Sequence, residues 1–362
     1  MVDWRNPPRL FIPGPVLVKD DALKELSRPA LGHRGKEYAQ LQQETVDLLK
    51  KVLFTNQYVF LSTSSASGIW EACIRNCVKP DEKVLATCCG AFSDKWAEVV
   101  ASCGRPVDVL KVDWGKAVTA EMIDQKLSTG QYAAITLVYS ETSTGLINPV
   151  YEIADMMKAK YPDVLVFVDA VSAMVGMPLH FDKLGWDAAF ASVQKAFALP
   201  PGFAVAAVSK RALEKSKTVP DRGYYFNFEL WADAAEKNQT LVTPSIPHIY
   251  GLRYQAEKLV NEGMENVWKR HKEMADYVRG WAKSKFALFC EERYASNTLT
   301  TVKNTRNIKV ADVIAAVQKK HNTVFGNGYK KLKDVTFRIA HMGDINMADV
   351  KELIGWIDEE IK

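Results

Sequence analysis

The sequence predicts an α/β fold, in which helices cover both faces of a mostly parallel sheet and a smaller α+β domain follows at the C-terminus. Three observations support this prediction. Short apolar runs alternate with helical patterns over most of the chain. These runs are too short and too uniformly apolar for strands that have one face in water. After about Tyr250 the pattern changes to a long helical stretch, followed by mixed strands and helices.

The large sheet is expected to contain six apolar runs: Tyr58–Leu61, Val84–Thr87, Val107–Leu110, Ala133–Val138, Val164–Val168 and Phe203–Val208. Helices are expected between strands at Ser67–Cys77 and Tyr151–Lys160, and before the first strand at Glu37–Leu53. In the last of these, the apolar residues recur with the spacing of a helix that has one face on a core.

The second part of the chain is expected to form the smaller domain. Its expected elements are a helical stretch from Leu252 to about Ser284, strands at Leu299–Val302 and Val335–Ala340, and helices at Val310–Lys320 and Met347–Ile361. We therefore place a large domain at residues 16–252 and a small domain at 253–362, and expect segment 1–15 to pack near the active site or the small domain. Because no low-complexity linker separates the domains, they should pack closely.

Composition excludes several classes of protein. The 362 residues are 48% hydrophobic and 25% charged, with a net charge of +4, which is typical of a soluble globular protein. No basic run interleaves with aromatic residues, so a nucleic acid partner is not expected. No stretch approaches the roughly 20 apolar residues of a membrane helix, and the first residues do not resemble a secretory signal. The six cysteines lack the paired spacing of a zinc site, so we expect free thiols in the cytoplasm and no metal.

Two residues suggest chemistry. Asp169 ends an apolar strand, where a carboxylate reaches the edge of the sheet at which open α/β folds bind ligands. Lys195 lies between a short apolar segment and a Pro-Pro-Gly break, 26 residues later, a spacing consistent with a neighbouring strand. A lysine held in a site can form an imine. Taken alone, Asp169 is weak evidence for function because strand-end aspartates often only cap a turn, and Lys195 fits a solvated turn, as most lysines near turns do.

The motifs around these residues resemble the class V aminotransferases of pyridoxal-5'-phosphate (PLP) fold type I. Segment 191–202 (ASVQKAFALPPG) follows a strand that ends in Asp-Ala-Val-Ser. Further motifs fall in the order that the family shows: 11–15 (FIPGP), 142–145 (TSTG), 243–246 (TPSI), 249–253 (IYGLR) and 337–343 (FRIAHMG). The nearest match within the class is the alanine–glyoxylate, serine–glyoxylate and serine–pyruvate group. The resemblance implies a seven-stranded large sheet and a homodimer.

The resemblance also implies how PLP is held. Lys195 corresponds to the lysine that forms a Schiff base with PLP and later moves the Cα proton as base and acid. Asp169 corresponds to the carboxylate that pairs with the pyridinium nitrogen and keeps the ring an effective electron sink. Gln194 and Thr142 match residues that contact the cofactor, Thr142 near its phenolic oxygen. Val171 would pack on one face of the ring.

The phosphate and the second ring face have matching residues as well. Ser65, Ala66 and Ser67 open a helix, and free N–H groups at a helix start bind phosphate readily. Without the resemblance, such a Ser-rich start would be taken as an ordinary N-cap. Phe92 takes the place of the aromatic residue that stacks on the ring. Thr243 matches a residue that reaches the phosphate from the neighbouring subunit, although the tyrosine often found three positions earlier is replaced here by Thr240.

Substrate contacts follow from the same resemblance. Arg338 matches the arginine that binds the α-carboxylate, a task that suits its planar, two-pronged guanidinium. Gly14, in the opening motif, is also assigned to the substrate site. His33 and Arg34 are ambiguous, because in phosphoserine aminotransferases the corresponding pair helps to bind the substrate phosphate. If the two residues face the pocket, they could favour an anionic side chain; if not, they serve packing or the dimer interface.

The leading hypothesis is therefore a transaminase that moves an amino group from serine or alanine to glyoxylate or pyruvate. A phosphoserine or aspartate aminotransferase is the main alternative. A PLP-dependent lyase such as a cysteine desulfurase needs a mobile late cysteine, and only Cys290, in an apolar context, is available. A binding protein without activity is disfavoured because Lys195, Asp169 and Arg338 are all present. No GxGxxG motif follows a strand, which disfavours a nicotinamide dehydrogenase.

Overall fold

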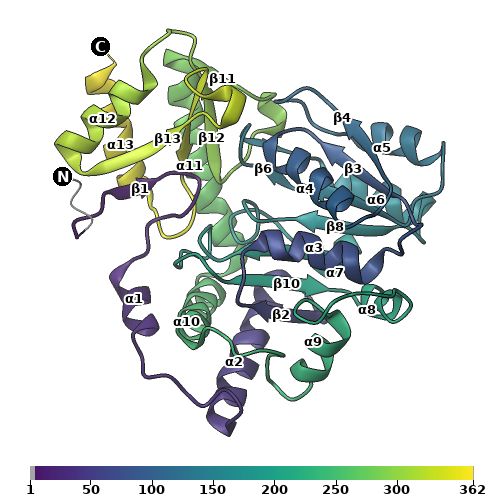
Figure 1. The fold of residues 1–362 in the computed structure, drawn as a ribbon. Helices are drawn as coiled ribbons and strands as arrows, with labels where there is room; N and C mark the ends of the chain where they lie inside the picture. The colour runs from purple at the N-terminus through teal and green to yellow at the C-terminus, as the bar shows by residue number, and fades with distance from the viewer. Residues whose placement is uncertain (1–4, 362) are drawn as a thin grey trace.

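A seven-stranded sheet forms the centre of the larger part of the molecule (Figure 1). The computed structural model describes residues 5–361; residues 1–4 and 362, which belong to the expected N-terminal segment and small domain, lie outside it. In sheet order the strands are β2 (Tyr58–Ser62), β10 (Ala204–Val208), β9 (Ala188–Ser192), β8 (Leu165–Asp169), β5 (Ala134–Val138), β3 (Val84–Cys88) and β4 (Val107–Lys111). Only β10 is antiparallel to its neighbours, so the expected mostly parallel sheet is confirmed.

Both faces of this sheet are buried, as the uniformly apolar runs predict. In β8, Val166 and Val168 point into one hydrophobic core, whereas Leu165 and Phe167 point into another on the opposite face. The helices that follow or flank these strands are α1 (Asp20–Leu26), α2 (Lys36–Leu53), α3 (Ala66–Cys77), α4 (Ala91–Ser102), α5 (Ala120–Leu127), α6 (Val150–Lys160), α7 (Phe181–Leu184), α8 (Lys210–Ser216) and α9 (Phe228–Ala235). A short hairpin, β6 (Ser140–Glu141) with β7 (Leu146–Ile147), lies beside the sheet.

A second sheet of five strands lies above the first in Figure 1. Its order is β1 (Arg9–Phe11), β13 (Thr323–Asn327), β14 (Thr336–Ala340), β12 (Leu299–Lys303) and β11 (Ala287–Leu288). Helices α12 (Val310–His321) and α13 (Met347–Glu360) pack against it with apolar side chains. Strand β1 comes from the N-terminal segment, and Arg9 adds ion pairs to Asp349 and Glu352 of α13.

The long helical stretch expected from Leu252 to Ser284 is two helices. These are α10 (Ile246–Glu262) and α11 (Met264–Lys285), and they meet at Gly263. Gly263 has φ +82°, a backbone conformation that glycine adopts without strain and that interrupts the helical path. Helix α10 packs on α1 and α2, whereas α11 packs on α13 and on strands β11 and β12. Because of the break, α10 packs with helices of the large part of the molecule and α11 packs with the small sheet.

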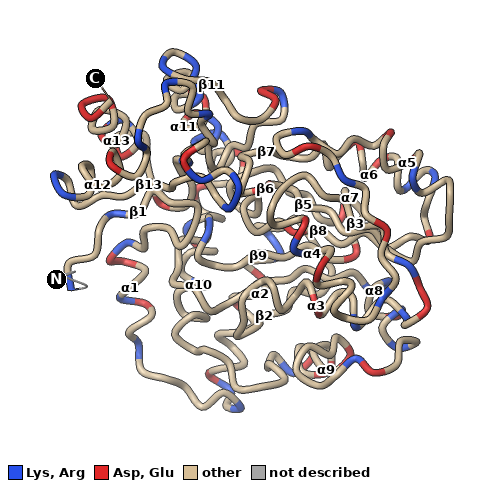
Figure 2. Tube along the Cα trace, turned by 45° about the horizontal axis from the view of Figure 1, so that its top comes forward, with Lys and Arg blue, Asp and Glu red and all other residues tan. Residues whose placement is uncertain are grey.

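Charged residues are mixed along the trace. Figure 2 shows Lys and Arg interspersed with Asp and Glu over most of the chain. Among residues 5–361, no helix is long and apolar enough to cross a membrane.

Candidate active site

The carboxyl ends of several parallel strands meet around one cavity of about 260 Å³. Asp169 is the last residue of β8, and Lys195 follows the end of the neighbouring strand β9 by three residues. Ten of the residues singled out from the sequence line this cavity: Gly14, Ser65, Ala66, Ser67, Phe92, Thr142, Asp169, Val171, Gln194 and Lys195. The fold thus gathers residues that are up to 181 positions apart in the sequence, from Gly14 to Lys195 (195 minus 14).

The Asp169 carboxylate is buried and held by two donors. Trp70 donates its indole Nε1–H to Oδ2 at 2.8 Å, and the backbone N–H of Val171 donates to Oδ1 at 2.8 Å. Burial raises the pKa of Asp169 to about 6, although the two hydrogen bonds and nearby Lys195 oppose the increase. A carboxylate in this environment gains strongly from a cationic partner, such as a protonated ring nitrogen.

The Lys195 amine is buried beside it, with the side chain 8% exposed. Its Nζ donates to the backbone carbonyl of Pro13. Burial lowers the pKa of Lys195 to about 8, with a further decrease from the positive charge of Arg338 and an opposing increase from Asp169. A lysine whose pKa lies this low is more readily deprotonated, and therefore more nucleophilic, than an exposed one.

Gly14 gives the lysine side chain its room. A Cβ at Gly14 would lie 2.7 Å from Cδ, Cε and Nζ of Lys195, and the φ of +102° is also one that side chains disfavour. The backbone N–H of Val16 donates to the carbonyl of Gln194 at 3.1 Å. The N-terminal segment therefore runs directly along the lysine on its way from the small sheet.

The start of helix α3 faces the cavity with unused polar groups. Ser65 is the N-cap residue, but its side chain makes no capping hydrogen bond. The N–H of Ala66 is held by Ser192 Oγ at 2.8 Å, which ties the helix start to the end of β9. Helix α3 has 12 residues, and the dipole of its backbone favours an anion at its start. Together with the serine hydroxyls, this helix start suits a phosphate group.

A further polar atom of the cavity has no partner. Gln194 Oε1 is buried and makes no hydrogen bond among the described residues. An unpaired buried carbonyl oxygen is costly, so a donor from a bound molecule would stabilise it. Together with the lysine amine, the aspartate carboxylate and the helix start, this orphaned oxygen shows that the residues fit an aromatic, phosphate-bearing cofactor such as PLP.

Phe92 is held in place by a buried carboxylate that sequence reasoning did not single out. Glu141, fully buried, accepts hydrogen bonds from the backbone N–H groups of Phe92 and Ser93 and from the N–H and hydroxyl of Ser143. It thus lies at the start of α4, where the helix dipole favours a negative charge. Since Thr142 is the next residue, Glu141 joins the segment that carries Thr142 to the segment that carries Phe92.

Arg338 lies on β14 of the small sheet and reaches toward the large one. Its Nε donates to the carbonyl of Asn327 at 3.0 Å, and Nη1 lies 3.4 Å from the carbonyl of Thr142. Burial lowers the pKa of Arg338 to about 10, and no carboxylate pairs with it among residues 5–361. The guanidinium therefore has donors left for an anionic ligand beside the cavity, although it does not line the cavity itself.

Three other residues singled out from the sequence lie outside the cavity lining. Arg34 donates to Gln239 Oε1 at 3.0 Å and to the backbone carbonyls of Thr240 and Leu241 at 2.8 and 3.0 Å. His33 Nε2 lies 3.4 Å from Thr243 Oγ1. In this chain, the two residues support segment 239–243, and Thr243 stands exposed at its end.

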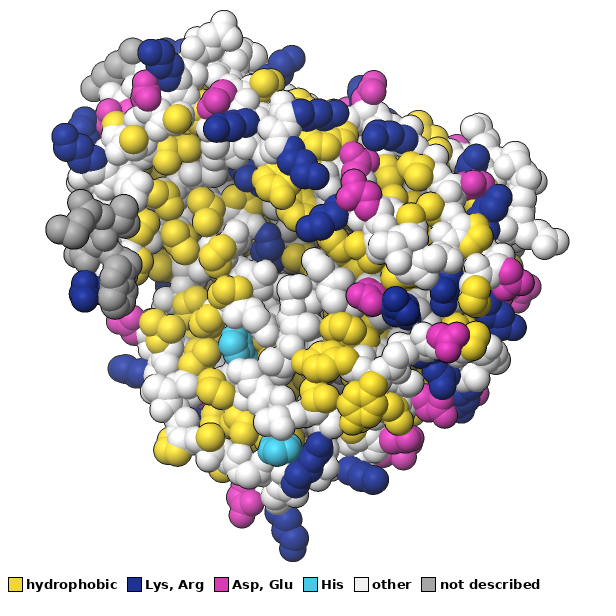
Figure 3. All heavy atoms as spheres, viewed as in Figure 1, with side chains coloured by type: hydrophobic (Ala, Val, Ile, Leu, Met, Phe, Trp, Pro, Cys, Tyr) yellow, Lys and Arg dark blue, Asp and Glu magenta, His cyan; other side chains and the backbone are white. Residues whose placement is uncertain are grey.

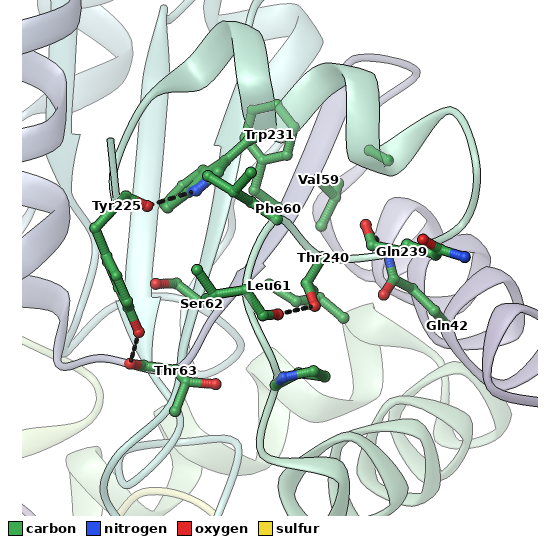
Figure 4. A pocket seen from close by; sticks show the side chains of 14 residues that line it. Gln42, Val59, Phe60, Leu61, Ser62, Thr63, Tyr225, Trp231, Gln239 and Thr240 are labelled. Carbon is green, nitrogen blue, oxygen red and sulfur yellow. Dashed lines mark hydrogen bonds between the residues drawn. The ribbon is translucent and has the colours of Figure 1, made fainter. Parts of the chain in front are cut away.

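A second cavity lies beside β2 (Figure 4). It is bounded by β2 and by segment 239–244, and no lysine, arginine, histidine or carboxylate lines it. On its border, Thr63 is held from two sides: Tyr225 Oη donates to its carbonyl at 3.0 Å, and the N–H of Ser245 donates to its Oγ1 at 3.0 Å. This region supports the segment that leads to Ser65.

Fold and site together define the class of protein, an α/β enzyme of the aminotransferase type. The family model for class V aminotransferases matches residues 24–328, and the chain belongs to that family. It is 30% identical to a serine–glyoxylate aminotransferase of Methylorubrum extorquens over 364 aligned residues, covering 96% of this chain and 89% of the relative. It is 29% identical to an L-aspartate–glyoxylate aminotransferase of Paracoccus denitrificans, covering 95% and 88%.

A solved structure agrees with the fold. The alanine–glyoxylate aminotransferase of Nostoc sp. superposes with a TM-score of 0.93 at 25% identity, covering 100% of this chain and 96% of that one. The fold type I architecture expected from the sequence motifs is therefore confirmed.

Proposed function

We propose that this aminotransferase binds PLP in the cavity around Lys195 and transfers an amino group from serine or alanine to glyoxylate or pyruvate. One observation carries the proposal: a buried lysine amine and a buried carboxylate line the same cavity from the ends of neighbouring strands, and the start of helix α3 lines it as well. The serine–glyoxylate and alanine–glyoxylate relatives support the choice of substrates.

The side chains of the cavity would hold PLP in a fixed orientation. Lys195 would link to it covalently through Nζ, Asp169 would keep a proton on the ring nitrogen, and Phe92 and Val171 would enclose the ring. Ser65, Ala66 and Ser67 would hold the phosphate, joined by Thr243 from a second subunit, while Thr142 and Gln194 would contact the ring's polar edge. PLP bound in this way supplies an electron sink for the electrons released at the substrate Cα.

The protein's own groups then direct the proton and the substrate. Once an amino acid has displaced Lys195 from the cofactor, the free Nζ of Lys195 would take the proton from the substrate Cα as a general base and would later give it back as a general acid. The lowered pKa of Lys195 brings this amine closer to the range in which general bases work near neutral pH. Arg338 would hold the α-carboxylate, and Gly14 would leave room for both the lysine and the substrate.

The choice between neutral and acidic donors rests on Arg34 and His33. Because all three hydrogen bonds of Arg34 go to segment 239–241, we propose that it supports this segment and does not select acidic side chains. The aspartate–glyoxylate relative keeps aspartate as the second candidate donor, and phosphoserine remains the third. The lyase alternative loses support because Cys290 is buried and burial raises the pKa of its thiol to about 12.

Labelling tests the cofactor assignment. Sodium borohydride should fix PLP on Lys195, so that digestion and mass spectrometry locate the pyridoxyl mass on that residue. A label on another lysine, or none, would overturn the assignment. A panel of donors (serine, alanine, aspartate and phosphoserine) with glyoxylate or pyruvate then tests the substrate. If aspartate or phosphoserine exceeds serine and alanine tenfold in kcat/KM, about 1.4 kcal/mol, the acidic alternative holds.

We also propose a homodimer in the cytoplasm, with domains at 16–252 and 253–362. Hydrophobic side chains gather on the face shown in Figure 3, where charged side chains are sparser in the middle than at the edge. Tyr224 and Tyr225 are also exposed, and exposed apolar side chains that gather in a patch are typical of protein interfaces. Sedimentation velocity should give twice the chain mass, and an active monomer would contradict the dimer.

A further inference from the structure

One loop of the small sheet crosses over to the large one beside the active site. Residues 328–335 connect β13 to β14. In this loop, the Tyr329 ring stacks on Phe92 with centroids 5.4 Å apart and planes 14° apart, and Lys331 Nζ lies 4.1 Å from the centre of the Trp114 ring. Both contacts reach residues in the connections of the large sheet, so the loop lies beside the site, although none of its residues lines the cavity itself.

Tyr329 contacts both a residue of the cofactor cavity and the arginine that would hold the substrate carboxylate. On one side it contacts Phe92, which lines the cofactor cavity. On the other, the Arg338 guanidinium lies over the Tyr329 ring, 5.5 Å from its centre. An amino acid whose carboxylate is bound to Arg338, and whose Cα faces the cavity, would therefore lie near the Tyr329 ring.

The loop is held rigidly enough to act as a wall. Asn327 Oδ1 accepts from the N–H of Gly328 at 2.6 Å and from the N–H of Asp334 at 2.9 Å, and Asn327 Nδ2 donates to Asp334 Oδ1 at 2.8 Å. The backbone N–H of Gly328 also donates to the carbonyl of Thr336. A Cβ on Gly328 would lie 1.8 Å from the carbonyl oxygen of Leu332, so the turn is compact as well as tied.

We propose that Tyr329 is a specificity-determining residue, which limits amino donors to short side chains by occupying the space next to the α-carboxylate site. The inference rests on the proposed function and refines its substrate class. Tyr329 is 36% exposed and belongs to no hydrophobic core cluster, so packing in the core does not account for an aromatic residue at this position. Its contacts with Phe92 and Arg338 do.

Two substitutions separate the size of the ring from its hydroxyl. Tyr329→Ala opens the space, whereas Tyr329→Phe keeps the wall. Tyr277→Ala is the matched control, because Tyr277 is 37% exposed and likewise packs against a cation, Lys351, but lies on α11 away from the cavity. The measurement is kcat/KM for alanine, 2-aminobutyrate, norvaline and norleucine with each holoenzyme.

We expect Tyr329→Ala to raise the norvaline-to-alanine ratio of kcat/KM at least tenfold. Tyr329→Phe and Tyr277→Ala should leave this ratio within threefold of the unchanged protein. An unaltered ratio in Tyr329→Ala would overturn the proposal, and so would an equal increase in Tyr277→Ala. If Tyr329→Ala fails to fold, Tyr329→Leu, which also shortens the wall, takes its place with the same expected direction.

A binding measurement keeps this inference separate from the proposed reaction. Calorimetry gives the dissociation constants of unreactive carboxylates, from acetate to hexanoate, at the Arg338 site. Tyr329→Ala should strengthen hexanoate relative to acetate at least fivefold, and an unchanged ratio would count against the wall. If the unchanged protein transaminates no donor but Tyr329→Ala shows this shift in carboxylate binding, the proposed function fails while the role of Tyr329 as a wall stands.

Discussion

At the scale of single residues, the charge on Asp169 is the feature most open to test. Asp169→Asn keeps the shape, but an amide cannot hold a proton on a ring nitrogen, and its NH2 group must face a donor, Trp70 Nε1 or the Val171 N–H. We expect cofactor to be retained and kcat to fall about a hundredfold or more, since a charge-assisted bond is worth a few kcal/mol.

The matched variant is Trp70→Phe, which removes one hydrogen bond to Asp169 and leaves the carboxylate. Its loss should be smaller, about tenfold or less. Steady-state rates together with cofactor absorbance distinguish the two effects. Near-normal turnover in Asp169→Asn would mean that Asp169 only terminates its strand, and equal losses in both variants would mean that the hydrogen bond matters more than the charge.

The sequence motifs identified the cavity residues that would contact the cofactor. They did not identify the residues that hold those side chains in place. Lys195 and Asp169 stand beside sequence breaks that mark strand ends, so their position was predictable. Trp70 follows Ser67 by three residues, one helical turn, and this spacing could have placed it on the same face. Nothing local shows that its indole reaches Asp169, 99 residues later, because that contact depends on how α3 packs over the large sheet.

At the scale of elements, helix α4 depends on one buried charge. Glu141 accepts from the N–H groups of Phe92 and Ser93 and from the Ser93 and Ser143 hydroxyls. In Glu141→Gln, one oxygen becomes an NH2 donor that faces other donors, and the negative charge at the helix start is lost. We expect a cost of a few kcal/mol and weaker PLP binding, because Phe92 is no longer fixed.

Thermal unfolding and titration of the cofactor-free protein with PLP measure both effects. Glu98→Gln is the control, since Glu98 is exposed on the same helix, and it should change neither quantity. A Glu141→Gln protein with an unchanged midpoint and unchanged PLP affinity would show that hydroxyl groups alone suffice to hold the start of α4.

Strands β9 and β1 were not among the apolar runs expected to form strands, and each has a physical reason. Strand β9 consists of Ala-Ala-Phe-Ala-Ser, and alanine is uncommon in strands, so only its neighbours β8 and β10 fix it as a strand. Strand β1 has three residues and is defined by pairing with β13, more than 300 positions away. Both depend on tertiary partners that a local pattern does not contain.

At the scale of the whole molecule, the α/β architecture was predictable but the connections between its parts were not. Alternation of apolar runs and helices sets the large sheet, yet it does not give the strand order. The sequence also does not show that the N-terminal segment pairs with the small sheet at Arg9–Phe11 and then contacts Lys195 through Pro13. A site shared between two sheets suggests that conditions which weaken their junction also weaken the enzyme.

Two buried histidines lie at this junction and make it sensitive to acid. His271, on α11, donates from Nδ1 to the carbonyl of Val267 and accepts at Nε2 from the N–H of Gly343. His341 follows β14, and its Nε2 pairs with Thr300 Oγ1 at 2.9 Å. Burial lowers the pKa of each to about 3, helped by Arg270 near His271 and by Arg279 near His341.

These depressed pKa values predict a loss of stability in acid. Each folded-state pKa lies below the unfolded value of about 6.5, so the unfolded chain binds more protons as the pH falls. The stabilisation is complete above about pH 6.5 and is lost progressively toward pH 3, at up to about 1.4 kcal/mol per pH unit for each histidine. For His271, a second N–H would also face the N–H of Gly343.

The variant His271→Gln isolates one of the two contributions. Gln can accept from the Gly343 N–H without titrating, so this variant should lose less stability than the unchanged protein between pH 7 and pH 5. The urea midpoint, measured in matched buffers at pH 7, 6 and 5, follows the difference, in which acid effects from other groups cancel. Equal losses in the two proteins would show that His271 is not the titrating group, and that water reaches it or the junction opens before it is protonated.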